Sequence, residues 1–241
     1  EIAIVGKYFG TGDYQLRDSY AALFDAIDHA CWNLGIRVKT RWIDAEKVNK
    51  DGEGLIGSPD GIIVPIGWGE RGTEGMIKAA SYARINKIPY LGLCYGMQLA
   101  VVAFARDVLG WKSANSSEND PKTKYPVIHL ISSQKEVMEK RSYGGTMRLG
   151  GWEAKVKKNT IAFDLYKKQL TSERHRHRFE FNNKYTKQFE DKGLVISARS
   201  VNENLVEIIE LPKTTHPFYL GTQGHPEYKS RPLNPHPIFV E

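Results

Sequence analysis

The feature that most constrains the fold is a regular alternation of short apolar runs with helical periods in the first 110 residues. Strand-like runs and amphipathic helical periods follow one another at 2–5, 20–34, 36–43, 62–64, 73–85, 90–93 and 97–109. Such an alternation predicts a mainly parallel sheet with helices on both faces. Ligands of these sheets bind where the strands end, so the loops after Val5, Val64 and Leu93 should meet at the site.

The second half of the chain carries short strand candidates instead of a continued alternation. A polar stretch at 113–125, interpreted as a surface loop, precedes candidates at 127–131, 178–181, 194–197, 205–211 and 218–222. No linker rich in Pro, Gly and Ser separates these strands from the first half, so we expect antiparallel additions to the same sheet. The sequence therefore predicts a single α/β domain over residues 1–241.

Composition limits the classes of function. The 241 residues carry 34 Lys and Arg against 28 Asp and Glu, which gives a net charge of +6. Acids lie near most of the bases, which argues against a dedicated nucleic-acid surface; an anionic partner or a domain interface explains the charge equally well. Neither a membrane-length apolar stretch nor a signal-peptide pattern is present, and two cysteines make no disulfide framework. We expect a cytoplasmic protein, and the start at Glu1, directly before an apolar run, suggests an excised domain.

The most informative segment is Gly92-x-Cys94-x-Gly96, in which a strand runs directly into a helix. This is the arrangement of a nucleophile elbow, with Cys in place of Ser, and its glycines are expected to let the backbone turn sharply. The helix N-terminus behind Cys94 favours a thiolate and offers N–H groups to an oxyanion. A buried structural cysteine is the alternative, and it is our interpretation of Cys31 on the apolar face of the first helix.

A cysteine nucleophile needs a base, and the base needs a group that orients it. The candidate is His225-Pro226-Glu227, directly after the last predicted strand. Proline favours an extended backbone, on which residues i and i+2 share a face, so Glu227 can hold the imidazole of His225. The alternative is a loop histidine beside a chance acid.

A glycine-rich loop follows the third strand. Three glycines within 67–72 suggest backbone N–H groups turned toward a ligand opposite Cys94, although a plain turn would also explain them. The Gly-x-x-x-x-Gly-Lys-[Ser/Thr] sequence of a phosphate-binding loop is absent. His175-x-His177 would suit a metal, but we favour a charged strand or an interface there and predict no metal site.

With these motifs the sequence resembles the class I, or triad, glutamine amidotransferases, and among them the glutaminase domains of the CTP synthase family. The cysteine elbow and His-Pro-Glu are shared by the whole class. The Gly-Gly-Thr-Met-Arg-Leu-Gly stretch at 144–150 and the Glu-Arg-His-Arg-His-Arg stretch at 173–178 resemble CTP synthases alone. Further marks lie at 5–8, 67–75, 91–98, 114–118, 223–227 and 230–232. The resemblance covers essentially the whole chain and implies a flavodoxin-like sheet with helices on both faces.

The resemblance also implies a mechanism. Cys94 would attack the side-chain carboxamide of glutamine, with His225 as base and Glu227 orienting it, through a γ-glutamyl thioester that water hydrolyses to glutamate. Backbone N–H groups of Gly67 and Tyr95 would hold the oxyanion. The substrate contacts that it implies are Gln98, Glu118, Arg178, Trp68 and Phe179, with Glu118 suited to the α-ammonium and Arg178 to the α-carboxylate.

In the family, a separate synthetase domain uses the ammonia to convert UTP to CTP with ATP and Mg²⁺, and GTP promotes glutamine hydrolysis. The resemblance thus implies two partners, L-glutamine and the synthetase domain of CTP synthase, and a homo-tetramer in the full enzyme. It implies no cofactor on this domain.

Four positions depart from the family pattern. Ile66 replaces a glycine beside the oxyanion loop, and Tyr95 follows the nucleophile where leucine is usual. Gly224 replaces an aromatic residue before the histidine, and Phe179 stands where tyrosine is common. The alternatives are therefore a non-catalytic or weakly active regulatory domain, with a site decayed through Ile66 and Tyr95, and a stand-alone hydrolase of another amide.

Overall fold

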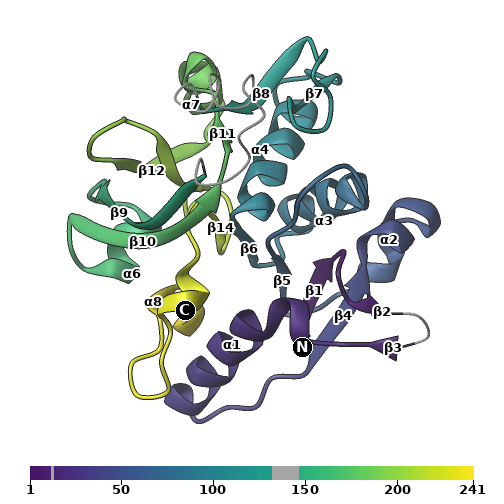
Figure 1. Cartoon of the computed structure of the whole chain (residues 1–241), viewed down its shortest axis with the longest axis vertical. Helices are drawn as coiled ribbons and strands as arrows, with labels where there is room; N and C mark the ends of the chain where they lie inside the picture. Colours follow the sequence, from purple (N-terminus) through teal and green to yellow (C-terminus); the bar gives the residue numbers. More distant parts are fainter. Residues whose placement is uncertain (12–13, 132–146) are drawn as a thin grey trace.

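The computed structural model describes residues 1–11, 14–131 and 147–241 (Figure 1). Within these residues nine strands form one large sheet. From edge to edge they are β10 (Leu170–His177), β9 (Arg148–Val156), β12 (Val195–Ser200), β13 (Val206–Glu210), β14 (Tyr219–Thr222), β6 (Tyr90–Leu93), β5 (Gly61–Val64), β1 (Ile2–Gly6) and β4 (Thr40–Asp44). The strands from β14 to β4 are parallel, and those from β13 to β10 are antiparallel to their neighbours. A parallel sheet with antiparallel additions is confirmed.

Two smaller sheets complete the β structure of the described residues. They are β11 (Phe179–Phe181), β8 (Tyr125–Leu130) and β7 (Ala114–Ser116) in one, and β2 (Gly10–Thr11) with β3 (Tyr14–Gln15) in the other. The prediction that all later strands extend the large sheet is wrong for β8 and β11. Their buried residues Val127, Ile128 and Phe181 pack with the α4 side of the core, so this sheet covers α4. Part of the stretch predicted as a surface loop is strand β7.

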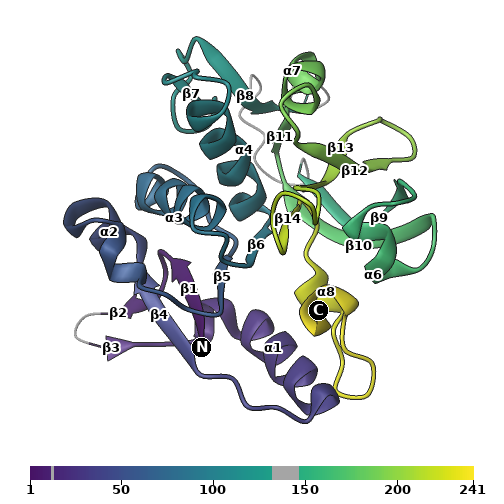
Figure 2. The ribbon, with the colours of Figure 1, turned by 180° about the vertical axis from the view of Figure 1, so that it is seen from behind.

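Helices cover both faces of the large sheet, as the alternation predicts (Figures 1 and 2). One face carries α1 (Ala21–Leu34), α6 (Ile161–Tyr166) and α8 (Pro237–Val240), and the other carries α2 (Ala45–Asp51), α3 (Thr73–Ile85), α4 (Tyr95–Asp107) and α7 (Thr186–Glu190). Alternate residues of each strand serve the two cores: Ile4 and Ile63 face α1, whereas Val5 and Val64 face α3 and α4. Among the described residues, no helix is long and apolar enough to cross a membrane.

The first helix follows its prediction except at its end. Gly35 caps α1 with a left-handed φ of 66°, as expected for a glycine after the last turn. Leu34, however, is 46% exposed and not on the apolar face. The strand predicted from residue 36 begins only at Thr40, because β1 starts at Ile2, whose partner is Thr40. Lys39 meets β1 only through its carbonyl, which accepts a hydrogen bond from the Ile2 N–H at 2.9 Å, and residues 36–38 precede the paired region.

The loops after β1, β5 and β6 meet at the carboxyl edge of the parallel strands, as predicted. Lys7 follows β1, Gly69 lies in the loop after β5, and Cys94 follows β6. The Lys7 ammonium donates a hydrogen bond to the carbonyl of Gly69 at 2.7 Å, and its Nζ lies 4.6 Å from the centre of the Tyr95 ring. This edge of the sheet is the natural place for a site.

Candidate active site

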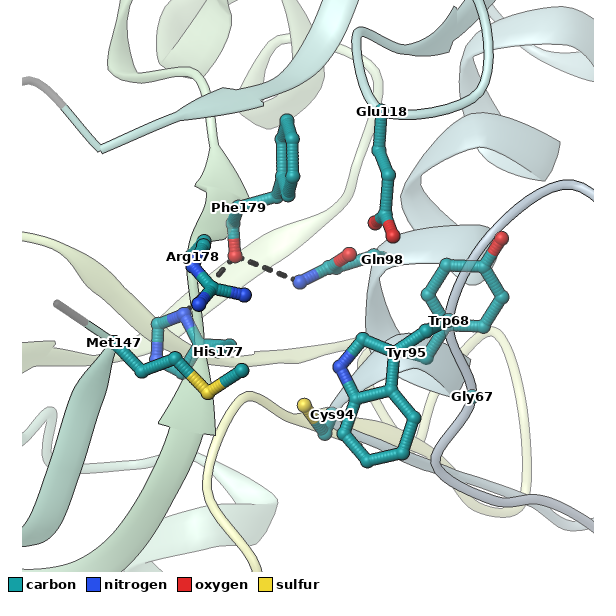
Figure 3. Close-up of a pocket in the computed structure, with 10 residues that line it drawn as sticks. All are labelled: Gly67, Trp68, Cys94, Tyr95, Gln98, Glu118, Met147, His177, Arg178 and Phe179. Carbon is teal, nitrogen blue, oxygen red and sulfur yellow. Dashed lines mark hydrogen bonds between the residues drawn. The ribbon is translucent and has the colours of Figure 1, made fainter. Parts of the chain in front are cut away.

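A narrow pocket at this edge brings together eight of the ten residues that the sequence assigns to a site (Figure 3). Its lining is Gly67, Trp68, Cys94, Tyr95, Gln98, Glu118, Met147, His177, Arg178 and Phe179. The other two predicted residues are also buried: His225 lies beside Cys94, and Glu227 lies beside His225. Of the stretch at 144–150, residues 144–146 lie outside the described residues, and Met147 is its contribution to the pocket.

The turn between β6 and α4 is strained at Cys94 itself. Cys94 has φ 52° and ψ −96°, a conformation that non-glycine residues seldom adopt. Neither Gly92 nor Gly96 has a positive φ, so they permit the sharp turn, as expected, through the room that a missing side chain leaves and not through their backbone angles. They are needed for close packing: a Cβ atom at Gly96 would lie 1.9 Å from the Val64 carbonyl oxygen, and one at Gly92 would lie 2.7 Å from the Gly96 carbonyl carbon.

The His225 imidazole is held by Glu227, as the sequence predicts. His225 Nδ1 lies 2.7 Å from Glu227 Oε1, and both side chains are buried. The predicted extended backbone is wrong, because Pro226–Lys229 form a 3-10 turn, whose first position tolerates proline. Burial lowers the pKa of His225, but the charges of Cys94 and Glu227 outweigh burial and raise this pKa well above its ordinary value.

The glycine-rich loop is fixed through the peptide groups of Gly69. Its carbonyl accepts hydrogen bonds from Lys7 Nζ at 2.7 Å and from the hydroxyls of Thr73 and Tyr95, each at 3.0 Å. Its N–H donates to Glu118 Oε1 at 3.0 Å. Burial lowers the pKa of Lys7 to about 8. Tyr95, a departure from the family pattern, thus supports the loop through its hydroxyl.

Two further departures have structural reasons. Ile66 is buried in the core on the α1 side, beneath the loop. Gly224 lies against β10: a Cβ atom there would be 2.6 Å from Glu173 Cβ, and the next residue, His225, donates its backbone N–H to the Arg174 carbonyl at 2.8 Å. A larger residue before the histidine has no room in this arrangement.

The far end of the pocket combines opposite charges. Burial raises the pKa of Glu118, while Lys7 and Arg178 favour its charged form. Gln98 projects between Glu118 and Arg178, and its buried Oε1 has no hydrogen-bond partner among the described residues (Figure 3). Trp68 is 38% exposed at the rim, with the Arg176 guanidinium 5.2 Å from its ring centre. This end therefore suits a ligand that carries a positive and a negative charge close together, with a hydrogen-bond donor near Gln98.

Strand β10 presents a buried histidine pair that the sequence indicates only as a charged strand. His175 Nδ1 lies 3.0 Å from His177 Nε2, and His177 Nδ1 lies 3.0 Å from the Phe179 carbonyl oxygen. Arg174 and Arg176 alternate with them on the exposed face. Within the described ranges no group of three or more His, Cys, Asp or Glu side chains could hold a metal ion. The pair anchors the backbone at Phe179, beside the pocket.

Acid should destabilise the protein through these two histidines. Burial lowers the pKa of His177 to about 3 and also lowers that of His175, with Arg148 adding to both shifts. Because the unfolded chain binds these protons near pH 6.5, the free energy of unfolding is expected to fall as the pH drops from 6.5 toward 3, by about 1.4 kcal/mol per pH unit for each histidine.

Urea unfolding between pH 4 and pH 7 checks this expectation. His177→Asn should show a slope smaller than the wild type by about one proton. Burial raises the pKa of Glu180 to about 8, so protonated Glu180 stabilises the folded protein at low pH, and this contribution is lost as the pH rises. It opposes the contribution of the histidines, but it is the same in the wild type and in His177→Asn. Equal slopes in the two proteins would contradict the expectation.

Sequence reasoning gave no role at the site to Met147 and His177, which line the pocket, or to Lys7 and Gln223. Lys7 holds the Gly69 carbonyl, and Gln223 Nε2 lies 3.5 Å from Cys94 Sγ. Both stand in stretches marked by the family resemblance, at 5–8 and 223–227, without a role. Their signal in the sequence is position alone, since each directly follows a strand that ends at the site.

The comparisons with known proteins agree with this geometry. The model of the family described as Glutamine amidotransferase class-I matches residues 15–241. A CTP synthase of Caldanaerobacter subterraneus subsp. tengcongensis is 54% identical over 240 residues, and one of Pyrococcus abyssi is 50% identical over 240 residues. In each case the match covers 99% of this chain and 43% of the relative. The chain thus spans less than half the length of these curated relatives.

A solved structure shows the same architecture. The glutaminase domain of Trypanosoma brucei CTPS, with bound acivicin, matches with a TM-score of 0.88 at 34% identity, over 99% of this chain and 90% of that one. The chain therefore belongs to the class I glutamine amidotransferase family, and within it to the glutaminase domains of CTP synthase.

Proposed function

We propose that this chain hydrolyses L-glutamine to glutamate and ammonia with a triad of Cys94, His225 and Glu227. The observation that carries the proposal is the buried 2.7 Å contact between His225 and Glu227 beside a cysteine on a strained elbow. The raised pKa of His225 favours an imidazolium beside Cys94, and the thiolate is the reactive form of a cysteine nucleophile.

In the first half-reaction the Cys94 thiolate attacks the carboxamide carbon of glutamine. Backbone N–H groups of Gly67 and Tyr95 receive the oxyanion, and both residues line the pocket with Cys94. A Cβ atom at Gly67 would lie 2.7 Å from Lys7 Cε, so a side chain there would displace the Lys7 side chain. The imidazolium of His225 then protonates the leaving nitrogen, ammonia departs, and a γ-glutamyl thioester remains on Cys94.

In the second half-reaction neutral His225 takes a proton from water, which attacks the thioester carbon. Collapse of this second tetrahedral intermediate releases glutamate and regenerates the Cys94 thiolate and the His225 imidazolium. Glu227 keeps one tautomer of His225 in place throughout, since its carboxylate holds Nδ1 at 2.7 Å.

The amino-acid end of glutamine fits the charged end of the pocket. Glu118 suits the α-ammonium and Arg178 the α-carboxylate, while the unpartnered Oε1 of Gln98 accepts a hydrogen bond between them. Trp68 and Phe179 line the same pocket as apolar walls.

Glu118→Gln is expected to raise KM for glutamine by about 10- to 100-fold with a smaller change in kcat. A charge-assisted hydrogen bond contributes about 1.5–3 kcal/mol, and the α-ammonium is equally bound before and during the reaction. The Gln side chain keeps an oxygen for the Gly69 N–H, so the loop should stay in place. Steady-state measurement of glutamate release checks this, and an unchanged KM would remove Glu118 from the substrate site.

Covalent labelling tests the proposal as a whole. The glutamine-analogue electrophile 6-diazo-5-oxo-norleucine should add to Cys94 in the wild-type chain, as read by peptide mass spectrometry, and excess glutamine should slow the addition. A chain whose Cys94 stays unlabelled, even with a CTP synthase synthetase domain and GTP present, would refute the proposal.

The wider role follows from the relatives. We propose that residues 1–241 form one domain, free of cofactors, whose ammonia serves a synthetase domain that uses ATP, Mg²⁺ and UTP. Support comes from relatives named CTP synthase, of which 57% lies outside the match (100 − 43). GTP activation, a homo-tetramer and a cytoplasmic location belong to the same proposal.

The departures from the family pattern favour an active enzyme over a decayed regulatory domain. The Tyr95 hydroxyl supports the Gly69 carbonyl, and Ile66 packs into the core without entering the pocket lining.

A further inference from the structure

We propose that the side-chain amide of Gln223 donates a hydrogen bond that stabilises the Cys94 thiolate. Gln223 Nε2 lies 3.5 Å from Cys94 Sγ. Gln223 is 0% exposed and Cys94 is 3% exposed, so water does not compete freely for the sulfur. The use of this contact in turnover rests on the proposed glutaminase function, whereas the contact itself does not.

The orientation of the Gln223 amide is set by the Phe179 carbonyl, which can only accept hydrogen bonds. Gln98 must therefore present its NH₂ group to this carbonyl, and Gln98 Nε2 lies 2.8 Å from that oxygen. The second hydrogen of the same NH₂ group points to Gln223 Oε1 at 3.2 Å. Gln223 therefore turns its oxygen to Gln98 and its NH₂ group to the sulfur (for Gln98 and Phe179, see Figure 3).

Both ends of this relay are anchored. The Phe179 carbonyl is also held by His177 Nδ1 at 3.0 Å. At the other end, Gln223 directly follows β14, and its backbone N–H donates to the Glu207 carbonyl at 2.8 Å. Strands β14 and β6 are paired up to their last residues, and the Cys94 N–H donates to the Thr222 carbonyl at 2.7 Å. The contact between amide and sulfur is thus fixed by the sheet.

A donor at this position matters because sulfur carries its charge at two stages. It is negative before it attacks the carboxamide and again when the thioester is cleaved, but neutral in the thioester itself. The charged and titratable groups that face it are His225, with Glu227 behind it, and Glu118, His177 and Arg178 across the pocket. In a buried site a hydrogen bond to the charged form shifts the equilibrium toward that form.

The pH dependence of Cys94 alkylation by iodoacetamide tests the proposal on the chain of 241 residues. Peptide mass spectrometry separates Cys94 from Cys31. Gln223→Met keeps the length of the side chain but removes the donor, and should move the midpoint of the rate profile upward by about one pH unit. Gln223→Glu places an acceptor toward the sulfur and should move it further. If Gln223 were only structural, the midpoints of the wild type, Gln223→Met and Gln223→Glu would not follow the order donor, neutral, acceptor.

Cys31 serves as the internal reference, because burial raises the pKa of its thiol and it lies in α1, outside the pocket lining, so its alkylation should stay equally slow in all three proteins. Unchanged midpoints in both variants, with Cys31 still protected, would overturn the proposal. Alkylation needs no glutamine, so a shifted midpoint without glutamate release would refute the glutaminase function alone.

A measurement on the wild type covers the case in which both variants lose the fold. In protein labelled with ¹⁵N at glutamine side chains, the Gln223 amide protons should move downfield over the pH range in which Cys94 becomes reactive. Amide resonances that do not move in this range would overturn the proposal.

Discussion

Cys94→Ala should reduce the release of glutamate from glutamine by about 10⁴- to 10⁶-fold, the loss typical of removing the nucleophile of a catalytic triad. The substitution deletes the sulfur that forms the thioester in the proposed mechanism, while His225 and Glu227 keep their 2.7 Å contact. A coupled assay of glutamate measures the loss. Cys31→Ala is the matched control: it removes the same atom from a buried cysteine in α1, and activity should change by less than about threefold.

Cys94 and His225 of the proposed triad should behave as one unit. His225→Asn should reduce glutamate release by a similar factor. Combining it with Cys94→Ala should reduce it little further, because the base acts only through the nucleophile. Additive losses, or a Cys94→Ala protein within a hundredfold of the wild type, would contradict the proposed chemistry.

Gly96→Ala should lower the free energy of unfolding by more than about 4 kcal/mol, an unusually large effect for one methyl group. The added Cβ would lie 1.9 Å from the Val64 carbonyl oxygen and 2.8 Å from its carbon. These are backbone atoms of β5, so neither they nor the first turn of α4 can give way cheaply. Urea unfolding of the variant measures the loss, and glutamate release should fall with it because Cys94 sits on the same turn.

Gly54→Ala is the control for this substitution. Nothing lies within 4 Å of a Cβ atom at Gly54, and its φ is not positive, so its stability should change by less than about 1 kcal/mol. Similar values for the two variants would show that helix α4 moves away from β5 at little cost.

The elements that the sequence predicts well are those whose cause is local. The strand, elbow and helix around Cys94 follow from residues within a few positions of one another, and α3 begins and ends where its pattern does. The pairing of His225 with Glu227 also depends on neighbours in sequence, although a 3-10 turn and not an extended chain brings them together.

The elements that it misses depend on distant neighbours. Gln223 touches Cys94 across 129 positions of sequence, and only the pairing of β14 with β6 makes them adjacent. The requirement for glycine at 224 comes from the contact with β10. The sequence does not predict the full length of this strand, because it is mostly charged and polar and lacks an apolar run. Likewise the sequences of β8 and β11 do not distinguish them from strands of the large sheet, because their separate sheet depends on packing against α4.

The order of strands has a consequence for how this domain is made. Strand β14 is the last member of the large sheet along the chain, yet it lies near the centre, between β6 and β13. Until β14 pairs with them, β6 and β13 would each have an open hydrogen-bonding edge, with a gap between them. Closing that gap is a late, long-range step, of the kind that slows folding. The same step delivers Gln223 and His225 to the sulfur, so the proposed release of ammonia would require a chain that has finished folding.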